Sequence, residues 1–490
     1  MSQLKRLAGD TAIYGISSIL GRSINYLLIF LHTAFFLPDE LGVITVLYSF
    51  VGFINVLYTF GMETTFFRFI NKPENKKAYN IAATVVILIS TLISALIIFK
   101  SQTVAVWLGY PDLHHFIVWL AVIVWIDGIM AIPFARIRQE NKAKLFATVK
   151  VGNILVNVLL QVTFLWIIPE FIPLSWVSSW YDPTLGVGYI ILANLIANAL
   201  FFLWLWKPIS KIRLSLDGAL LKPMLKYAFP IMIMGLAGIA NEMLGNILLE
   251  YLLPDTFYKN MSSTAAVGVY GQTLKLSIFM ILAIQAFRYA GEPFFFSQAK
   301  EKNAPELFAR VMHYFVIASL LILMLVSMNV HFIAEIFLRK PEYRVALYLV
   351  PILMLGKLFF GIYVNLNVWF KLTDKTMYGT YFSLLGAAVT VVGNILLIPY
   401  LGFTGSAITS VLCYFSMSFL CYRTGKFRYP IPYNFQKLLP YFIICTAFGF
   451  AGALYKYPDF IIDTISKLLI SLIIILLIIG VEKPGLIKKT

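Results

Sequence analysis

The chain has 490 residues, of which 60% are apolar and only 13% are charged, and its formal net charge is +16. A soluble domain of ordinary composition has about 25% charged residues, and a single hydrophobic core stops growing near about 250–300 residues. The composition therefore excludes an ordinary soluble protein and predicts a surface that largely faces lipid. The basic residues lie in short loops between apolar runs, which indicates membrane topology rather than nucleic-acid binding.

The apolar runs predict an all-α integral membrane protein with fourteen transmembrane helices. A bilayer core about 30 Å thick needs about 20 helical residues, and lipid-facing backbone must satisfy its hydrogen bonds within the segment. In chain order the expected spans are 11–36, 41–67, 78–99, 115–135, 144–168, 187–206, 224–251, 263–289, 306–329, 344–366, 376–399, 403–422, 436–455 and 460–481.

Lysine and arginine are unevenly distributed between the two sets of alternating loops. The segments 136–144, 207–226 and 423–437 are rich in them, whereas the longest loop of the other set, 169–186, has none. Basic residues accumulate on the cytoplasmic side of membrane proteins. We therefore expect both termini to be cytoplasmic.

Short motifs recur at an interval of six predicted helices. Gly42-Val43 opens the second span, and Gly268-Val269 lies near the start of the eighth. Gly152-Asn153-Ile154-Leu155 in the fifth span recurs as Gly393-Asn394-Ile395-Leu396 in the eleventh. An even interval gives both halves the same orientation, so we expect two six-helix lobes related by a pseudo-two-fold axis along the membrane normal. The expected lobes are 1–206 and 207–422, with two extra helices in 423–490.

Several basic residues lie within the predicted spans, where a charge costs roughly 2.5–3.5 kcal/mol at mid-membrane. Arg22, Lys275 and Lys357 lie deepest. We expect them to line a central hydrophilic cavity between the lobes and to bind substrate there. Lys150 and Lys467 lie nearer to span ends, and we expect their ammonium groups to extend toward the membrane surface.

Neutral polar residues and carboxylates occur in the same spans. Glu242 and Asn246 are four residues apart and share one helix face, and Asp127 is isolated in the fourth span. Asp127 and Glu242 are candidates for binding a coupling H⁺ or Na⁺. The alternative is pairing between helices, for example of Asp127 with Arg22 or of Glu242 with Lys275. The expected polar lining of the cavity is Asn25, Asn153, Asn157, Asn194, Asn198, Asn241 and Asn246.

No pattern in the sequence indicates catalysis. The three cysteines show no metal-ligand spacing, no glycine-rich phosphate loop occurs, and the histidines, His32 among them, lie mostly near span ends, where we expect interfacial positions. We predict a protein that is not an enzyme and has no cofactor or metal.

Arg22, Leu37-Pro38-Asp39-Glu40-Leu41-Gly42, Gly61 and Arg68 resemble the opening of bacterial polysaccharide biosynthesis flippases, the Wzx-type O-antigen or oligosaccharide translocases of the MOP superfamily. The stretch Arg288-Tyr289-Ala290-Gly291-Glu292-Pro293-Phe294 is similar to the matching region of such proteins. The resemblance covers the whole chain, although its motifs are short.

The resemblance implies movement of an undecaprenyl-diphosphate-linked oligosaccharide from the cytoplasmic to the periplasmic leaflet of the bacterial inner membrane. The implied partners are that glycan, membrane lipids and a polysaccharide polymerase, with no nucleic acid. A lipid II flippase of the same superfamily and a cation-coupled multidrug exporter of the MATE type remain alternatives. A membrane glycosyltransferase or polymerase is disfavoured, because the longest outer loop holds only Glu170 and Asp182 as charged residues.

Overall fold

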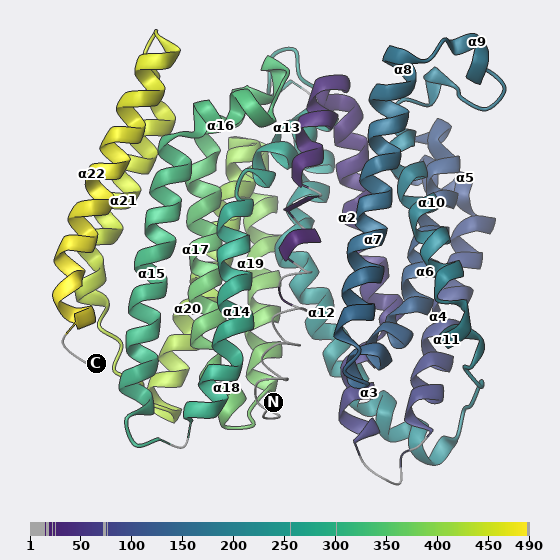
Figure 1. Cartoon of the computed structure of the whole chain (residues 1–490), viewed down its shortest axis with the longest axis horizontal. Helices are drawn as coiled ribbons and strands as arrows, with labels where there is room; N and C mark the ends of the chain where they lie inside the picture. Colours follow the sequence, from purple (N-terminus) through teal and green to yellow (C-terminus); the bar gives the residue numbers. More distant parts are fainter. Residues whose placement is uncertain are drawn as a thin grey trace. The chain divides into compact units, whose positions relative to one another are not determined.

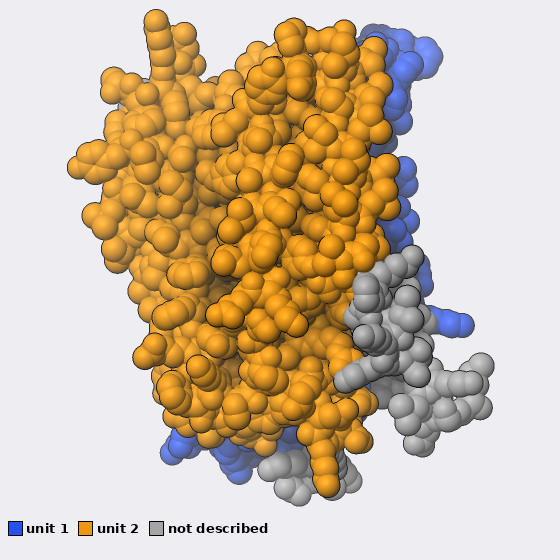
Figure 2. Space-filling model, turned by 90° about the vertical axis from the view of Figure 1, so that its left-hand side faces the viewer, with its two compact units in different colours: residues 1–36, 44–243 blue, residues 37–43, 244–490 orange. Residues whose placement is uncertain are grey.

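The structure is a computed structural model that describes residues 15, 19–21, 23–24, 26–71, 75, 77–254, 256–299 and 301–487. Within this part of the chain the regular secondary structure is helical, with no strand. The chain forms two compact units (Figure 2): the first contains residues 1–36 and 44–243, and the second contains 37–43 and 244–490.

The first unit is built around α6, which packs against α4, α7 and α10 (Figure 1). Its helices in the described residues are α2 (Pro38–Thr59), which begins in the second unit, α3 (Met62–Ile70), α4 (Ala78–Phe99), α5 (Ser101–Trp107), α6 (His114–Gln139), α7 (Ala143–Val162), the π-helical turn Thr163–Ile167, α8 (Ile168–Phe171), α9 (Leu174–Val177), α10 (Gly188–Trp204), α11 (Trp206–Ser210) and most of α12 (Gly218–Leu252).

In the second unit the long helices run lengthwise beside one another, with α17 against α15 and α20, and α15 also against α21 and α22 (Figure 1). Its described helices are α13 (Ser263–Lys275), α14 (Ile278–Gln298), α15 (Ala304–Met328), α16 (Val330–Phe337), α17 (Val350–Leu366), α18 (Val368–Leu372), α19 (Met377–Leu401), α20 (Phe403–Arg428), α21 (Phe435–Leu454) and α22 (Phe460–Ile487).

Every predicted span has a helical counterpart in the described residues. Among the described residues, eleven helices are long and apolar enough to cross a membrane, and the bent pair α13 and α14 raises this number to twelve. Ile19–Phe35 and Gly188–Trp204 are shorter apolar helices. The prediction of an all-α membrane protein is confirmed, and the count of fourteen crossings is consistent with these helices.

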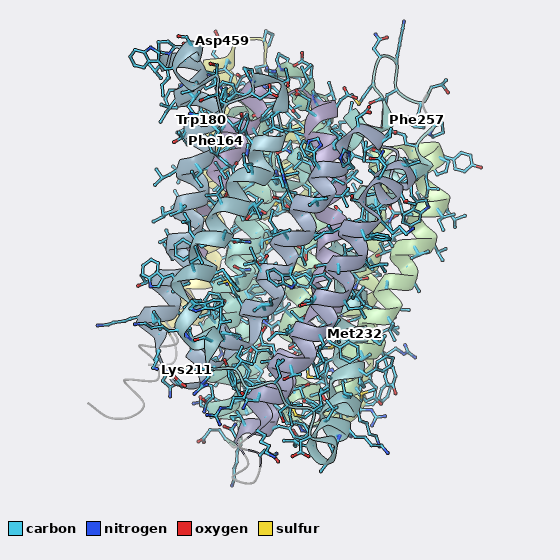
Figure 3. The ribbon with its side chains drawn as sticks, turned by 90° about the vertical axis from the view of Figure 1, so that its right-hand side faces the viewer. Phe164, Trp180, Lys211, Met232, Phe257 and Asp459 are labelled. Atoms are coloured by element: carbon cyan, nitrogen blue, oxygen red, sulfur yellow. The ribbon has the colours of Figure 1, made fainter. Side chains whose placement is uncertain are left out.

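The ends of the first unit carry different residues. Figure 3 shows Phe164 and Trp180 toward one end of its helices and Lys211 toward the other. Trp176 and Trp180, in the loop that was expected outside, are 78% and 60% exposed. Exposed tryptophan suits a membrane interface, but it occurs at both interfaces, so the sidedness rests on the loop charges and stays a prediction.

The boundary between the compact units lies after residue 243 rather than at the expected 206. The cause is the amino-terminal half of α12, where Met224 and Ala228 are buried against Met62, Phe66 and Tyr79. Burying these side chains together joins residues 218–243 to the first unit. The two extra helices expected in residues 423–490 are α21 and α22, which pack against α15 within the second unit.

The repeated Gly-Asn motif occupies the same structural role twice. A Cβ atom at Gly152 of α7 would lie 3.0 Å from the ring of Phe201 in α10, the next long helix. A Cβ atom at Gly393 of α19 would lie 2.8 Å from Thr409 in α20, which again is the next long helix. In both places glycine lets consecutive helices approach closely.

The glycines of the other repeated motif, Gly42 and Gly268, lie where α2 and α13 cross within the second unit. A Cβ atom at Gly42 would overlap the carbonyl oxygen of Thr264, and one at Gly268 would overlap that of Pro38. Each glycine thus meets the residue four positions before the other glycine. Contacts exchanged in this way are the signature of a local two-fold axis, here between the starts of α2 and α13.

Candidate functional site

A polar cavity of about 310 Å³ lies inside the first unit, between α6, α7 and α10 and the start of α3. The apolar part of its wall includes Met130, Phe134 and Phe201. Its charged and amide-bearing lining residues are Glu63, Asp127, Arg138, Lys150, Asn153 and Asn198. Three of these six, Asp127, Asn153 and Asn198, belong to the predicted site.

Those three residues form a chain of hydrogen bonds across three helices. The side-chain amide of Asn153 in α7 donates to Oδ1 of Asn198 in α10, at 2.8 Å. The amide of Asn198 donates in turn to Oδ1 of Asp127 in α6, at 3.0 Å. The amide of Asn198 is neutral, so its hydrogen bond does not compensate the negative charge of the Asp127 carboxylate. Asp127 is therefore suited to attract a cation or a proton from the cavity.

The charges around this cavity are mixed. Arg138 forms an ion pair with Glu63, while Asp127 and Lys150 add one charge of each sign. The Lys150 ammonium lies 5.5 Å from the centre of the Phe146 ring. The cavity of the first unit therefore contains two cations and two anions, and none of the three expected cavity cations lines it.

Arg138 and Glu63 were not predicted as site residues. The fourth span was expected to end at residue 135, which left Arg138 in a loop, whereas α6 continues to Gln139. Arg138 follows Asp127 by about three helical turns and so lies on the same face of α6. That spacing was the available signal. Glu63 follows the break at Gly61, whose φ of 67° separates α2 from α3.

A second polar row in the first unit uses Asn157 and Asn194. The Asn157 side-chain oxygen accepts from Gln161 at 3.0 Å, and the Gln161 oxygen lies 2.6 Å from Nε2 of His32. The side chain of His32 is 8% exposed, because it packs within the helices and bonds to Gln161, while its expected depth at the membrane interface stays a prediction. Separately, Asn194 donates to the Tyr48 hydroxyl at 3.0 Å.

In the second unit, Lys275 lies at a break in the predicted eighth span. Residues 263–289 were expected as one helix, but α13 ends at Lys275 and α14 starts at Ile278 with a bend of 47°. The Lys275 ammonium donates to Oε1 of Gln272 at 3.0 Å. A cation in the last turn of a helix also faces the negative end of its dipole. Transporters place binding sites at such discontinuous helices.

Lys357 is buried in the middle of α17, with 6% of its surface exposed. Its ammonium lies 5.6 Å from the centre of the Tyr414 ring, and it has no carboxylate partner among the described residues. The aromatic face offsets part of the cost of the buried charge. Of the three predicted cavity cations, Lys275 and Lys357 thus belong to the second unit. Arg22 lies outside the described residues.

The polar residues predicted in the seventh span lie on α12, and the boundary between the two compact units falls among them. Asn241 is buried and Glu242 is exposed in the first unit, whereas Asn246 is buried in the second. Glu250 accepts a hydrogen bond from Thr264 at 2.6 Å, so at least this carboxylate has a local structural role. Asn25 lies outside the part of the chain that the structure describes.

Asn365 of α17 is a buried polar residue that was not among the residues predicted from the sequence to line the cavity. Its side chain is fully buried, and neither polar atom of its amide makes a hydrogen bond with any described residue. Oδ1 of Asn394, in the repeated motif, is in the same state. A buried amide without a partner costs free energy unless a ligand or water satisfies it. No periodic signal distinguishes Asn365 in the sequence, because it is one polar residue near the end of an apolar helix.

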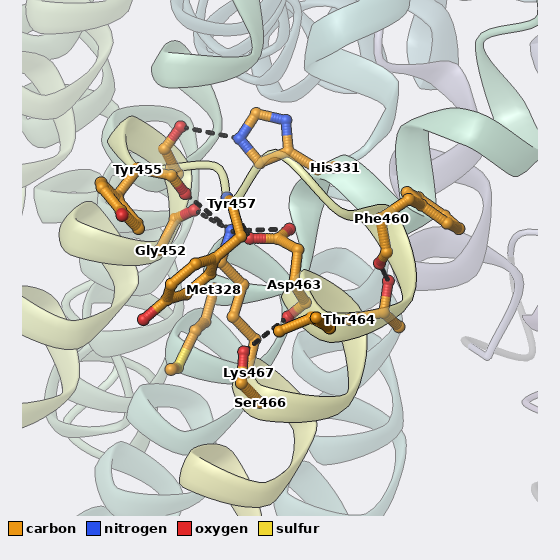
Figure 4. Close-up of polar contacts among 12 residues, drawn as sticks. Met328, His331, Gly452, Tyr455, Tyr457, Phe460, Asp463, Thr464, Ser466 and Lys467 are labelled. Carbon is orange, nitrogen blue, oxygen red and sulfur yellow. Dashed lines mark hydrogen bonds and ion pairs between the residues drawn. The ribbon is translucent and has the colours of Figure 1, made fainter.

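Lys467 has a structural role, as Figure 4 shows. It was expected to extend toward the membrane surface, but only 4% of it is exposed. Its ammonium donates to the carbonyls of Gly452 and Tyr455, at 2.9 and 2.7 Å, and pairs with Asp463 at 2.9 Å. The unpaired carbonyls at the end of α21 attract the cation inward, so the expectation was wrong.

The sequence of residues 34–290 matches the family model described as polysaccharide biosynthesis protein, and residues 247–396 match the MatE family model. A search of curated proteins found no match.

Solved structures share the fold. The lipid II flippase MurJ in an inward closed conformation matches with a TM-score of 0.73 and 14% identity, over 97% of this chain and all of that one. An inward-facing MATE family transporter of the MOP superfamily has a TM-score of 0.61 and 14% identity, over 83% and 94% of the two chains. A mutant of the Vibrio cholerae MATE transporter VcmN gives 0.60 and 16%, over 87% and 98%.

Proposed function

Because this chain belongs to the polysaccharide biosynthesis protein family, whose model covers residues 34–290, we propose that it translocates an undecaprenyl-diphosphate-linked oligosaccharide repeat unit from the cytoplasmic to the periplasmic leaflet of the bacterial inner membrane. The family match is the observation that carries the proposal. The MOP-type fold supports it, since transporters and a lipid flippase share this fold.

The substrate has two polar parts that need different side chains. The diphosphate is anionic, and Arg22, Lys275 and Lys357 are the cations that we assign to it. Lys357 supports this assignment because a buried cation without a carboxylate partner among the described residues attracts an anion strongly. The glycan needs hydrogen-bonding groups, which amides such as Asn153 and Asn198 provide.

The energy source in our proposal is a proton or sodium ion bound at Asp127. The Asp127 carboxylate lies beside a polar cavity and accepts a hydrogen bond from an amide. Binding of a cation there would change the charge of the cavity by one unit and so couple ion binding to the conformation of the first unit. Glu242, which is exposed, is the second candidate.

Export of cationic drugs is the second candidate function, because residues 247–396 match the MatE family model. The balanced charge of the cavity in the first unit also suits a cationic solute better than an all-cationic wall would. The buried Lys357 and the partly buried Lys275 favour an anionic substrate instead.

Deletion of the gene in its host, followed by analysis of the surface glycans and the lipid-linked oligosaccharide pool, separates the candidates. We expect one surface glycan to disappear and its lipid-linked repeat unit to accumulate on the cytoplasmic side. Complementation with Lys275→Gln or Lys357→Gln should fail, whereas complementation with Lys375→Gln, an exposed lysine outside the predicted spans, should succeed. Normal glycan pools together with increased sensitivity to cationic drugs would support the exporter.

A further inference from the structure

Two adjoining cavities in the second unit lie outside the site described above. The first, of about 310 Å³, is formed by the start of α15, the linker before α21 and the carboxyl-terminal part of α22. Its ionisable lining residues are Arg310, His313, Lys437 and Glu482, together with Tyr314 and Tyr433. The basic members belong to segments that the loop charges assign to the cytoplasmic side.

This first cavity is electropositive. Both oxygens of Glu482 are already engaged: His313 lies 3.2 Å from one, and the Tyr441 hydroxyl donates to the other at 2.7 Å. Arg310 and Lys437 have no ion-pair partner among the described residues, and both are exposed. Two cations are therefore available to an anion that enters the cavity.

The second cavity, of about 420 Å³, is almost entirely apolar. It is lined by α15, α17, α20 and α21, with Phe359, Phe415 and Phe442 among its walls. Ser418 is a polar residue of the lining, and its hydroxyl donates a hydrogen bond to the carbonyl of Phe359 at 2.7 Å. Tyr422 is the other lining residue with a polar side-chain group, so a groove of this composition suits a hydrocarbon chain far better than a polar solute.

The two cavities are neighbours, because Phe435 and Leu438 line both. A basic cavity therefore lies next to an apolar groove between the helices. Phe415 and Phe419 of that groove are 47% and 49% exposed, so the groove is open to the surroundings of the second unit. This arrangement of charge and apolar surface matches an amphiphile with an anionic head and a hydrocarbon tail.

We propose that this surface binds an anionic diacyl phospholipid of the cytoplasmic leaflet, with its phosphate between Arg310 and Lys437 and one acyl chain in the apolar groove. Basic pockets between helices on the cytoplasmic side bind anionic head groups. Free phosphate would use only the basic cavity and leave the groove without an occupant. The proposal does not depend on the transported substrate.

The test is native mass spectrometry of the full-length protein in detergent, titrated with phosphatidylglycerol and, separately, with phosphatidylcholine of the same acyl chains. We expect the anionic lipid to be retained more strongly. The double variant Arg310→Gln/Lys437→Gln should weaken phosphatidylglycerol binding about thirtyfold, because each cation near an anionic lipid contributes about a factor of five. Leu439→Gln, which places an amide in the groove, should weaken binding of both lipids.

Lys375→Gln is the matched control, since it removes an exposed cation of a predicted cytoplasmic loop that lines neither cavity, and it should bind like the parent. Arg310→Lys keeps the charge and should retain binding, which separates loss of charge from misfolding of the double variant.

Equal retention of the two lipids would overturn the proposal. Displacement of the lipid by millimolar inorganic phosphate would identify a phosphate site instead, and preferential displacement by a polyprenyl phosphate would assign the groove to that lipid.

Discussion

Asp127, Asn198 and Asn153 act as one hydrogen-bonded unit, because Asn198 both donates to Asp127 and accepts from Asn153. Asn198 should therefore contribute more to the stability of the protein than Asn153. Removing Asn198 leaves a donor and a charged acceptor unpaired at once, whereas removing Asn153 leaves only one acceptor free. The order of these two effects follows from connectivity alone.

We expect Asn198→Leu to lower the stability of the protein in detergent by about 1–2 kcal/mol, near the upper end of measured side-chain hydrogen bonds between membrane helices. Asn153→Ala should have a smaller effect. Thermal unfolding of the purified variants measures both. An Asn153→Ala variant that is less stable than Asn198→Leu would contradict the proposed order.

Lys467 and Asp463 illustrate the opposite situation, a charged pair whose partners are complete. Replacing Lys467 by methionine leaves a buried carboxylate without its cation, and breaking such a pair costs about 3–5 kcal/mol. The double variant Lys467→Met/Asp463→Leu removes both charges and should recover part of that loss, because it leaves unpaired only neutral groups, the carbonyls of Gly452 and Tyr455 and the backbone amide of Tyr457. Unfolding midpoints of the two variants check the prediction, and a double variant as unstable as the single one would refute it.

At the scale of the helix, glycine sets how closely elements approach. Gly42 and Gly268 lie where even one methyl group would overlap a backbone carbonyl oxygen. Backbone cannot move aside as a flexible side chain can. By contrast, a Cβ atom at Gly238 of α12 would meet nothing within 4 Å, which makes this position a suitable control.

We expect Gly42→Ala and Gly268→Ala each to separate the starts of α2 and α13 and to lower the unfolding midpoint by several degrees. Gly238→Ala should leave the midpoint unchanged or raise it, because alanine favours a helix over glycine by about 1 kcal/mol. The measurement is thermal unfolding of the three variants side by side. Equal effects at Gly42 and Gly238 would show that the crossing does not constrain the fold.

At the scale of the whole chain, apolar run length and loop charge predicted the helices well. Each expected span has a counterpart, because lipid leaves few alternatives for an apolar segment of that length. The deviations are local. The helix of the eighth span breaks after Lys275, and α6 continues to Gln139, whereas hydropathy along the chain marks neither position.

The candidate site was harder to predict than the helices. Asp127, Asn153 and Asn198, which line one cavity, were selected from the sequence because polar residues in apolar spans are conspicuous, and their role in binding stays a prediction. Arg138 was missed because a basic residue near a span end is normally read as a loop residue. The compact-unit boundary at residue 243 differs from the expected lobe boundary at 206, because the packing of Met224 and Ala228 joins the first half of α12 to the first unit.

The orientation of the protein in the membrane is a prediction that cysteine labelling tests directly. Ser179 and Ser210 are exposed at opposite ends of the first unit, close to Trp180 and Lys211. The native cysteines, Cys413, Cys421 and Cys445, are buried and should give little background. We expect a membrane-impermeant maleimide to label Ser179→Cys in intact spheroplasts and to label Ser210→Cys only after permeabilisation. The reverse pattern would invert the topology.

The exchanged contacts of Gly42 and Gly268 have an evolutionary consequence. If the two repeats descend from one duplicated gene, a single ancestral glycine once served both sides of a symmetric crossing, and one mutation altered both. After duplication the positions mutate separately, yet each still touches the residue four positions before the other. In related sequences we therefore expect a larger residue at position 42 to be accompanied by a change near position 264, and one at position 268 by a change near position 38.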